Sequence, residues 1–149
     1  MIKSLIASVL TSIQRNSLEK VSFTTDMWSD PDLKPYMAVT AHWLEYVQTS
    51  SGGKKLTLRA SLIGFLHFPG THTEERLAEA FSFIIGRTGL ERKVISIFLL
   101  QFSWFVSFKI GWITTDNATN NSSMMTVLED KLRIKDPNTT FLAREHHIR

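Results

Sequence analysis

The chain has 149 residues, of which 43% are apolar and 11% aromatic, and its formal net charge is +3. This length and apolar content allow one ordinary core, which excludes a disordered polypeptide and gives no sign of a second domain. The absence of cysteine excludes a disulfide framework and a thiolate metal site within the sequence. The small positive charge permits a nucleic-acid partner without demonstrating one.

The first twenty residues predict an amphipathic helix that packs on the rest of the domain. Apolar residues recur there at helical spacing, namely Ile2, Leu5, Ile6, Val9, Leu10 and Ile13. The apolar run is short and is broken by Ser8, so we favour this helix over a targeting peptide. Residues 1–20 are therefore expected to form an N-terminal helix, and residues 21–149 the body of the domain.

Residues 21–68 predict three strands joined by short connections. In "KVSFTTDMW", apolar and polar residues alternate, while "YMAVTAHWLEYV" and "LTLRASLIGFLHF" are rich in β-branched and aromatic residues. The connections "SDPDLKP" and "QTSSGGKK" contain the Pro, Asp and Gly residues that are typical of turns. Three successive strands with short connections indicate an antiparallel meander.

The apolar period changes to that of a helix after residue 70. "THTEERLAEAFSFIIGRTG" predicts a helix, and Thr71 and Glu74 have the spacing of a capping box at its start. A strand, "KIGWITTD", and a further helix, "NATNNSSMMTVLEDKLRI", follow. The residues expected to face inward are Leu77, Ala80, Phe81, Ile84 and Ile85 in the first helix and Met124, Met125, Leu128 and Leu132 in the second.

The tripeptide Thr-Thr-Asp occurs twice, and each copy follows an apolar, strand-like segment and ends in an aspartate, Asp26 or Asp116. If the two strands are parallel neighbours, both carboxylates emerge at one edge of the sheet, where a divalent cation would remove their repulsion. A pair of such ions about 4 Å apart can activate a water and stabilise the leaving oxygen in phosphodiester cleavage. The spacing alone leaves open that both aspartates only cap turns or helices.

These segments resemble the hAT transposase superfamily, named after hobo and Activator, and its domesticated BED-finger relatives. The resemblance is carried in order by "VSFTTDMWSD", "YMAVTAHWLE", "GTHTEERLAEAF" and "KIGWITTDNATNN", across residues 5–135. It implies an α/β fold of ribonuclease H-like type: an N-terminal helix, an antiparallel three-strand meander, a helix, a parallel strand and a helix. It also implies DNA cutting and joining by an Asp-Asp-Glu triad with Mg²⁺ or Mn²⁺, in which Asp26 and Asp116 are the catalytic and metal-binding aspartates.

The resemblance further implies a truncated domain. The glutamate of the triad lies far downstream in the family, and Glu129 and Glu145 follow Asp116 too closely to match it. The BED zinc finger and the dimerisation segment of the family have no counterpart either. We expect a transposase fragment with two of the three metal-binding acids, inactive alone. The alternative is a domesticated non-catalytic module that binds DNA or protein, so whether this chain is an enzyme stays open.

Several other side chains are candidates for shaping the site or contacting DNA. Trp28, in the first motif, could pack in the core or stack on an unpaired base. His72 stands where the family carries a His-Thr pair, and it could contact the DNA backbone or merely cap a helix. Asn117 belongs to the second motif. His146 and His147 could bind a metal, but we expect them to form a frayed tail.

The resemblance also suggests partners and a location. DNA at transposon ends is the expected partner, the full-length family forms homo-oligomers, and the nucleus is the expected compartment. No membrane partner is expected. Each of these expectations depends on the family resemblance, since composition and spacing do not specify them.

An uncharged segment, "VISIFLLQFSWFVSF", occupies residues 94–108 and contains five aromatic residues. A membrane helix needs about 20 residues, so a buried strand or helix is the simpler interpretation. Removing residues 94–109 joins Lys93 to Ile110 and produces "GLERKIGWITTDNATNN", a continuous match to the family motif. We therefore expect residues 94–109 to be an insertion or a retained intron.

Overall fold

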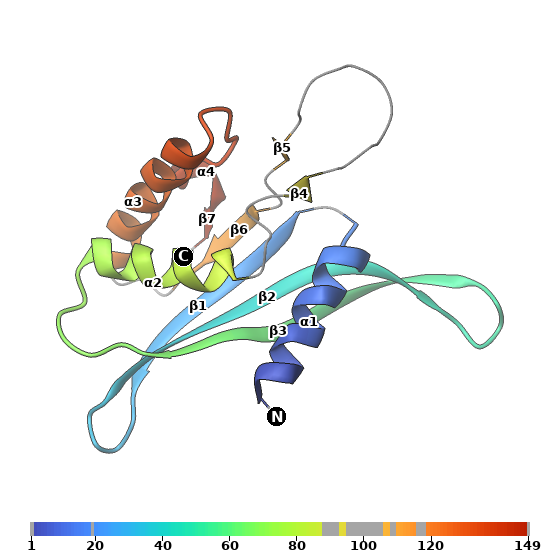
Figure 1. Ribbon diagram of the computed structural model, residues 1–149, viewed down its shortest axis with the longest axis horizontal. Helices are drawn as coiled ribbons and strands as arrows, with labels where there is room; N and C mark the ends of the chain where they lie inside the picture. Colours follow the sequence, from blue (N-terminus) through green and yellow to red (C-terminus); the bar gives the residue numbers. More distant parts are fainter. Residues whose placement is uncertain are drawn as a thin grey trace.

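The structure is a computed structural model that describes residues 2–18, 20–87, 93–94, 106–107, 110–115 and 119–148. Its elements are, in chain order, α1 (Ile2–Asn16), β1 (Val21–Ser29), β2 (Pro35–Gln48), β3 (Lys54–His67), α2 (Glu74–Gly86), β4 (Lys93–Val94), β5 (Val106–Ser107), β6 (Ile110–Thr114), α3 (Thr119–Lys135), α4 (Ala143–His146) and β7 (His147–Ile148). Helices pack against a twisted sheet (Figure 1), which confirms the expected mixed α/β class.

The main sheet has five strands in the order β3-β2-β1-β6-β7. β1 and β2 pair antiparallel, as do β2 and β3. On the other side of β1, β6 runs parallel to it, and β7 runs parallel to β6. A local meander is thus extended by strands that come from far along the chain.

One face of this sheet, called the covered face, carries the core. Along β1, Val21 and Phe23 are fully buried, while Ser22 and Thr24 project to the opposite side because successive strand residues alternate. The Phe23 ring meets Phe81 of α2 edge to face, with ring centroids 5.9 Å apart. Helices α1, α2 and α3 supply further buried residues: Ile13, Leu77, Ala80, Ile84, Ile85, Met124, Met125, Leu128 and Leu132. The inward faces predicted for α2 and α3 are confirmed.

The opposite face of β1, β2 and β3, called the open face, keeps large apolar side chains exposed. Residues paired across antiparallel strands share a side, so the register assigns these side chains to one face. They are Trp28, Leu44, Tyr46, Leu56, Leu58, Leu62 and Phe65. In the described part of the chain, the covered face of the meander therefore holds the core, whereas the open face leaves apolar side chains exposed.

The start of α2 differs from the predicted capping box. The helix begins at Glu74 with Thr73 as its N-cap, and the Thr73 side chain makes no capping hydrogen bond. Arg76 holds the preceding loop instead, because its guanidinium donates to the carbonyl oxygens of Thr71 (3.0 Å) and Pro69 (2.6 Å). The box prediction was wrong because a long side chain from inside the helix reached back to the loop, which spacing cannot show.

The expected frayed histidine tail was also wrong. His147 belongs to β7, level with Ile113 of β6, and Ile148 accepts a hydrogen bond from the backbone of Thr115 (3.1 Å). The ring of His146 lies against Phe141, with centroids 5.1 Å apart. Of the two histidines, His147 therefore extends the sheet, and His146 ends the short helix α4 that precedes it.

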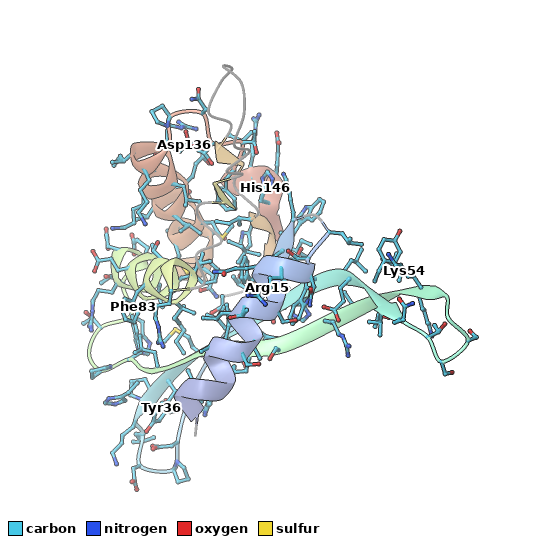
Figure 2. All side chains as sticks on the ribbon, turned by 45° about the vertical axis from the view of Figure 1, so that its right-hand side comes forward. Arg15, Tyr36, Lys54, Phe83, Asp136 and His146 are labelled. Carbon is cyan, nitrogen blue, oxygen red and sulfur yellow. The ribbon has the colours of Figure 1, made fainter. Side chains whose placement is uncertain are left out.

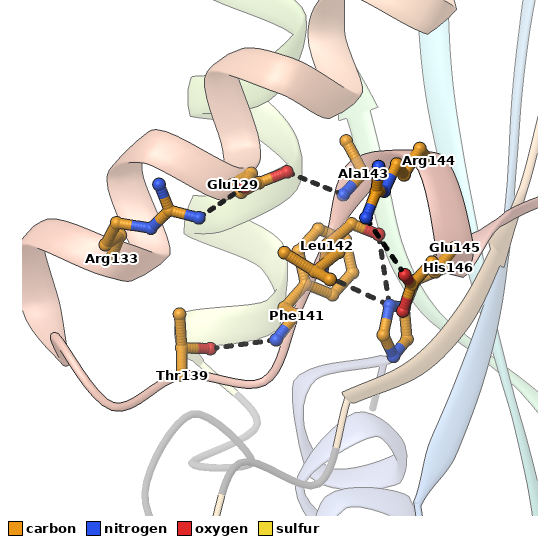
Figure 3. Close-up of polar contacts among 9 residues, drawn as sticks. All are labelled: Glu129, Arg133, Thr139, Phe141, Leu142, Ala143, Arg144, Glu145 and His146. Carbon is orange, nitrogen blue, oxygen red and sulfur yellow. Dashed lines mark hydrogen bonds and ion pairs between the residues drawn. The ribbon is translucent and has the colours of Figure 1, made fainter.

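Glu129 of α3 fixes the segment that leads to this last strand (Figure 3). One carboxylate oxygen accepts from the backbone N–H of Ala143 (2.7 Å), and the other pairs with Arg133 one turn along the helix (2.5 Å). Glu129, which is too close to Asp116 in the sequence to match the catalytic glutamate, thus has a structural role. It secures the start of α4 to α3.

Only the ends of the uncharged segment lie within the described residues. Lys93 and Val94 form β4, which pairs antiparallel with Val106 and Ser107 of β5. Residues 95–105 and 108–109 lie outside the described residues, so the insertion and the retained intron both stay predictions. Of the helices within the described ranges, none has the length and apolar character needed to cross a membrane.

Candidate functional site

The site is built around the parallel contact between β1 and β6, which precede the two aspartates. Phe23 is level with Ile113 and Thr24 with Thr114, so the two Thr-Thr pairs lie side by side. At the start of the contact, the backbone N–H of Trp112 donates to the hydroxyl of Ser22 (3.3 Å). This geometry fulfils the condition under which both aspartates would emerge at one edge of the sheet.

A glycine allows β6 to approach β1 this closely. A Cβ added to Gly111 would lie 2.9 Å from the hydroxyl of Ser22 and 3.2 Å from the carbonyl oxygen of Val21. Both distances are shorter than ordinary van der Waals contact, and one obstacle is backbone. The glycine in "KIGWITTD" therefore contributes directly to the alignment of the two motifs.

Asp26 lies on the open face within β1, three residues before the strand ends at Ser29. The sequence suggested that Asp26 ends the strand, but β1 continues because its partner β2 pairs with it as far as Pro35. The Asp26 side chain is exposed, and in the described part of the chain it makes no ion pair or hydrogen bond. It is an accessible carboxylate with open coordination positions.

The threonines of the two motifs have different environments. The Thr24 hydroxyl is 3.1 Å from Nε2 of His42 on β2, and the Thr115 hydroxyl is 2.8 Å from Nε2 of His147 on β7. Thr25 is buried, and within the described residues its hydroxyl has no hydrogen-bond partner. Histidines from both flanking strands thus brace the strands that carry the motifs.

Four rings gather on the open face beside Asp26. Trp28 lies 5.1 Å from Phe65 between ring centroids, and Tyr36 stacks on Phe65 at 5.2 Å. His67 lies 5.3 Å from Tyr36 (labelled in Figure 2), which completes the group. Trp28 is 41% exposed, so it packs in an accessible aromatic cluster and not in the buried core.

The other predicted site residues are placed less completely. His72 lies in the exposed loop before α2, with its ring 5.4 Å from that of Phe68. Asp116 and Asn117 lie outside the described residues, so the separation of the Asp26 and Asp116 carboxylates stays a prediction. The described residues contain no group of three His, Asp or Glu side chains that could hold a metal ion.

Sequence reasoning missed Tyr36, His42, Phe65 and His67 as neighbours of Asp26. The signal that could have found them is the antiparallel register, which sets Asp26 opposite Ala38 and Ala38 opposite Phe65. Two of these residues are aromatic and occur in strands, where such residues are common, so composition alone gave them no special status.

The fold and the site together define a mixed α/β domain whose central strand β1 carries an exposed aspartate beside a parallel partner strand. The sequence model of the ZBED1 RNase-like domain matches residues 24–103, more than half of the chain. The chain therefore belongs to the ZBED1 RNase-like domain family and is of the hAT transposase type. The matched residues include Asp26, Trp28 and His72 and end before Asp116.

Curated relatives agree with this assignment. The chain is 27% identical over 130 residues to an AC transposase and to an AC9 transposase, both from Zea mays. It is 28% identical over 120 residues to the transcriptional regulator tpeD of Talaromyces stipitatus. These alignments cover 87%, 87% and 80% of this chain but only 13%, 13% and 11% of the relatives. No solved structure matches the chain significantly.

Proposed function

We propose that this chain is part of the ribonuclease H-like catalytic domain of a hAT-type DNA transposase, and that Asp26 and Asp116 are two of its metal-binding acids. The observation that carries the proposal is the parallel pairing of β1 with β6, which aligns Thr24 with Thr114. Each aspartate follows its aligned threonine by two positions, so continued pairing would bring the carboxylates to one edge. The family assignment supports the same role.

The chemistry of Asp26 fits a hard divalent cation. Carboxylate oxygens are ligands that Mg²⁺ and Mn²⁺ prefer, and the exposed Asp26 has no competing partner among the described residues. Bound Mg²⁺ or Mn²⁺ would supply an activated water and stabilise the leaving oxygen of a DNA phosphodiester. Trp28 and its neighbouring rings would offer a surface for an unpaired base, and His72 and Asn117 are further candidates for DNA contact.

The chain alone is expected to bind metal weakly and to perform no strand transfer. Two carboxylates leave part of the coordination sphere to water, and a third acid would add charge that holds the ions. DNA at transposon ends, a homo-oligomeric full-length protein and a nuclear location belong to the same proposal.

Titration of Mn²⁺, followed by the loss of the free-ion electron paramagnetic resonance signal, tests the metal role. We expect Asp26→Asn and Asp116→Asn each to weaken binding about tenfold or more, since the charge of the ligands sets affinity. Asp32→Asn is the matched control, because Asp32 is exposed and pairs with Lys34 at the nearby turn. Equal binding by all three variants would remove the metal role from this pair.

A nicking assay on supercoiled DNA tests the expected inactivity of the isolated chain. We expect no cleavage by the isolated chain with Mn²⁺. Cleavage that disappears in Asp116→Ala, without any other polypeptide, would contradict the expected inactivity and make the chain an enzyme by itself.

A non-catalytic module that binds DNA or protein is the second candidate function. It is favoured by the similarity to a protein named as a transcriptional regulator. DNA binding that is unchanged by Mn²⁺ and by both aspartate substitutions would support this alternative.

A further inference from the structure

The outer part of the β2–β3 hairpin, residues 44–58, forms an arm that extends away from the helices (Figures 1 and 2). β2 and β3 have 14 residues each, which corresponds to about 45 Å of strand. On this arm, even the large apolar side chains of Tyr46 and Leu58 are 58% and 68% exposed. The arm is longer than the core requires, which suggests a binding role.

The tip of the arm has a defined shape. The backbone N–H of Thr49 donates to the carbonyl oxygen of Gly53 (2.8 Å), and the Thr49 hydroxyl accepts from the Gly53 N–H (3.0 Å). Gly52, with φ of +84°, makes the left-handed turn that closes the loop. The two residues that follow, Lys54 and Lys55, are therefore presented from an ordered hairpin.

Beyond Glu45, the charged side chains of the arm are all positive. Residues 46–73 contain no aspartate or glutamate, whereas β3 carries Lys54, Lys55 and Arg59. Arg59 is neutralised by the buried Glu45 at 2.8 Å. Both lysines are exposed, and no acidic partner for either lies among the described residues. The arm therefore ends in two unneutralised positive charges.

The two lysines leave opposite faces of the ribbon. Lys54 is level with Gln48 and Lys55 with Val47, and adjacent strand residues alternate in direction. A two-stranded ribbon fits the major groove of B-DNA, which is about 12 Å wide. At the tip of such a ribbon, two long side chains that leave in different directions can contact two different phosphates.

We propose that this arm binds the backbone of duplex DNA, with Lys54 and Lys55 each contacting a phosphate. The inference rests on the proposed function only in taking DNA as the partner. A second copy of the chain is the competing occupant, since the arm also exposes Leu44, Tyr46, Leu56 and Leu58. Charge favours DNA, because symmetric pairing of two arms would bring lysines of like charge together.

Fluorescence anisotropy with a labelled duplex of arbitrary sequence, over a range of salt concentrations and in EDTA, tests the arm. Each lost phosphate contact should reduce the slope of log K against log salt by about 0.9. For Lys54→Gln/Lys55→Gln the slope should thus fall by about 1.8. Between about 50 and about 200 mM salt, wild-type binding should weaken about tenfold more than binding by the variant.

The matched control is Arg87→Gln/Arg144→Gln, which also removes two positive charges. Arg87 is exposed at the C-terminal end of α2, and Arg144 is exposed in α4. We expect this variant to keep the wild-type slope. Identical slopes for the two double variants, or no DNA binding by the wild type at low salt, would overturn the proposal. So would a dimer in sedimentation velocity that Leu56→Ser/Leu58→Ser dissociates while the lysine variant binds DNA normally.

Failure of the arm is distinguishable from failure of the metal site. EDTA removes divalent cations, so the DNA measurement does not depend on Asp26 or Asp116. The Mn²⁺ titration contains no DNA and does not depend on Lys54 or Lys55. Each result therefore bears on one proposal alone.

Discussion

The covered and open faces of the same meander are made from alternate residues of the same strands, yet one is buried and the other exposes large side chains. On the covered face, Phe23 and Val39 are fully buried beneath helices. On the open face, Asp26 and the exposed ring of Trp28 belong to the same strand as Phe23. The difference shows that one strand can serve the core on one side and keep polar and aromatic side chains accessible on the other, since alternation separates the two faces.

The largest expected effect tests the covered face. Phe81→Ala should lower the free energy of unfolding by about 3–5 kcal/mol, because it removes a fully buried ring that contacts Phe23 and leaves a cavity. Urea unfolding followed by circular dichroism measures this. Phe83→Ala is the matched control, because Phe83 lies on the same helix but is 58% exposed, and it should change stability by less than about 1 kcal/mol. Equal losses would contradict the burial of Phe81 against the covered face.

A smaller effect is expected where α2 touches the covered face. A Cβ added to Gly64 of β3 would collide with the side chain of Ile84, so Gly64→Ala should destabilise by about 1–3 kcal/mol. Gly53→Ala is the control, since the nearest atom to its added Cβ would be the Thr49 hydroxyl at 3.4 Å. A neutral Gly64→Ala in the same unfolding experiment would mean that α2 can shift away from the sheet.

The smallest effect lies at the base of the arm, where the covered face becomes polar. A hydrogen bond from Arg59 holds the pKa of Glu45 below its ordinary value, and one from Trp43 adds to this. Because the folded pKa is lowered, the stabilisation is complete above the ordinary glutamate pKa. It is lost as the pH falls through the lowered value.

Glu45→Gln should therefore cost up to about 1 kcal/mol near neutral pH, since the half-exposed Arg59 is partly screened by solvent. The difference from wild type should shrink as the pH falls below about 4.3. Thermal unfolding from neutral to acidic pH measures it. Glu79→Gln, at an exposed carboxylate 3.5 Å from Lys131, is the control, and a pH-independent difference for Glu45→Gln would contradict the assignment.

The sequence predicted much of the covered face because burial leaves a periodic trace. Alternation around Val21 and Phe23, and the helical spacing of Phe81 and Leu128, correctly indicated which side chains would be buried. The Thr-Thr-Asp echo also indicated two strands with similar ends, and their parallel pairing is observed.

Other features depend on partners that are distant in the sequence. The two residues of β7, His147 and Ile148, are too few to show a strand pattern, and only their pairing with β6 makes them a strand. The extension of β1 past Asp26 depends on its register with β2. The aromatic cluster beside Asp26 depends on β3, so local periodicity could not reveal the candidate site in full.

The pairing of β4 with β5 has a consequence for chain entropy and evolution. It sets Lys93 level with Ser107, so the uncharged segment leaves and returns at nearly one point. The entropy lost on closing a flexible connection grows slowly, by about 0.6 kcal/mol for each doubling of its length. Lengthening the connection between β4 and β5 would therefore add only a small closure entropy. A lineage could acquire such a stretch, by insertion or by translating an intron, without first evolving compensating changes in the sheet.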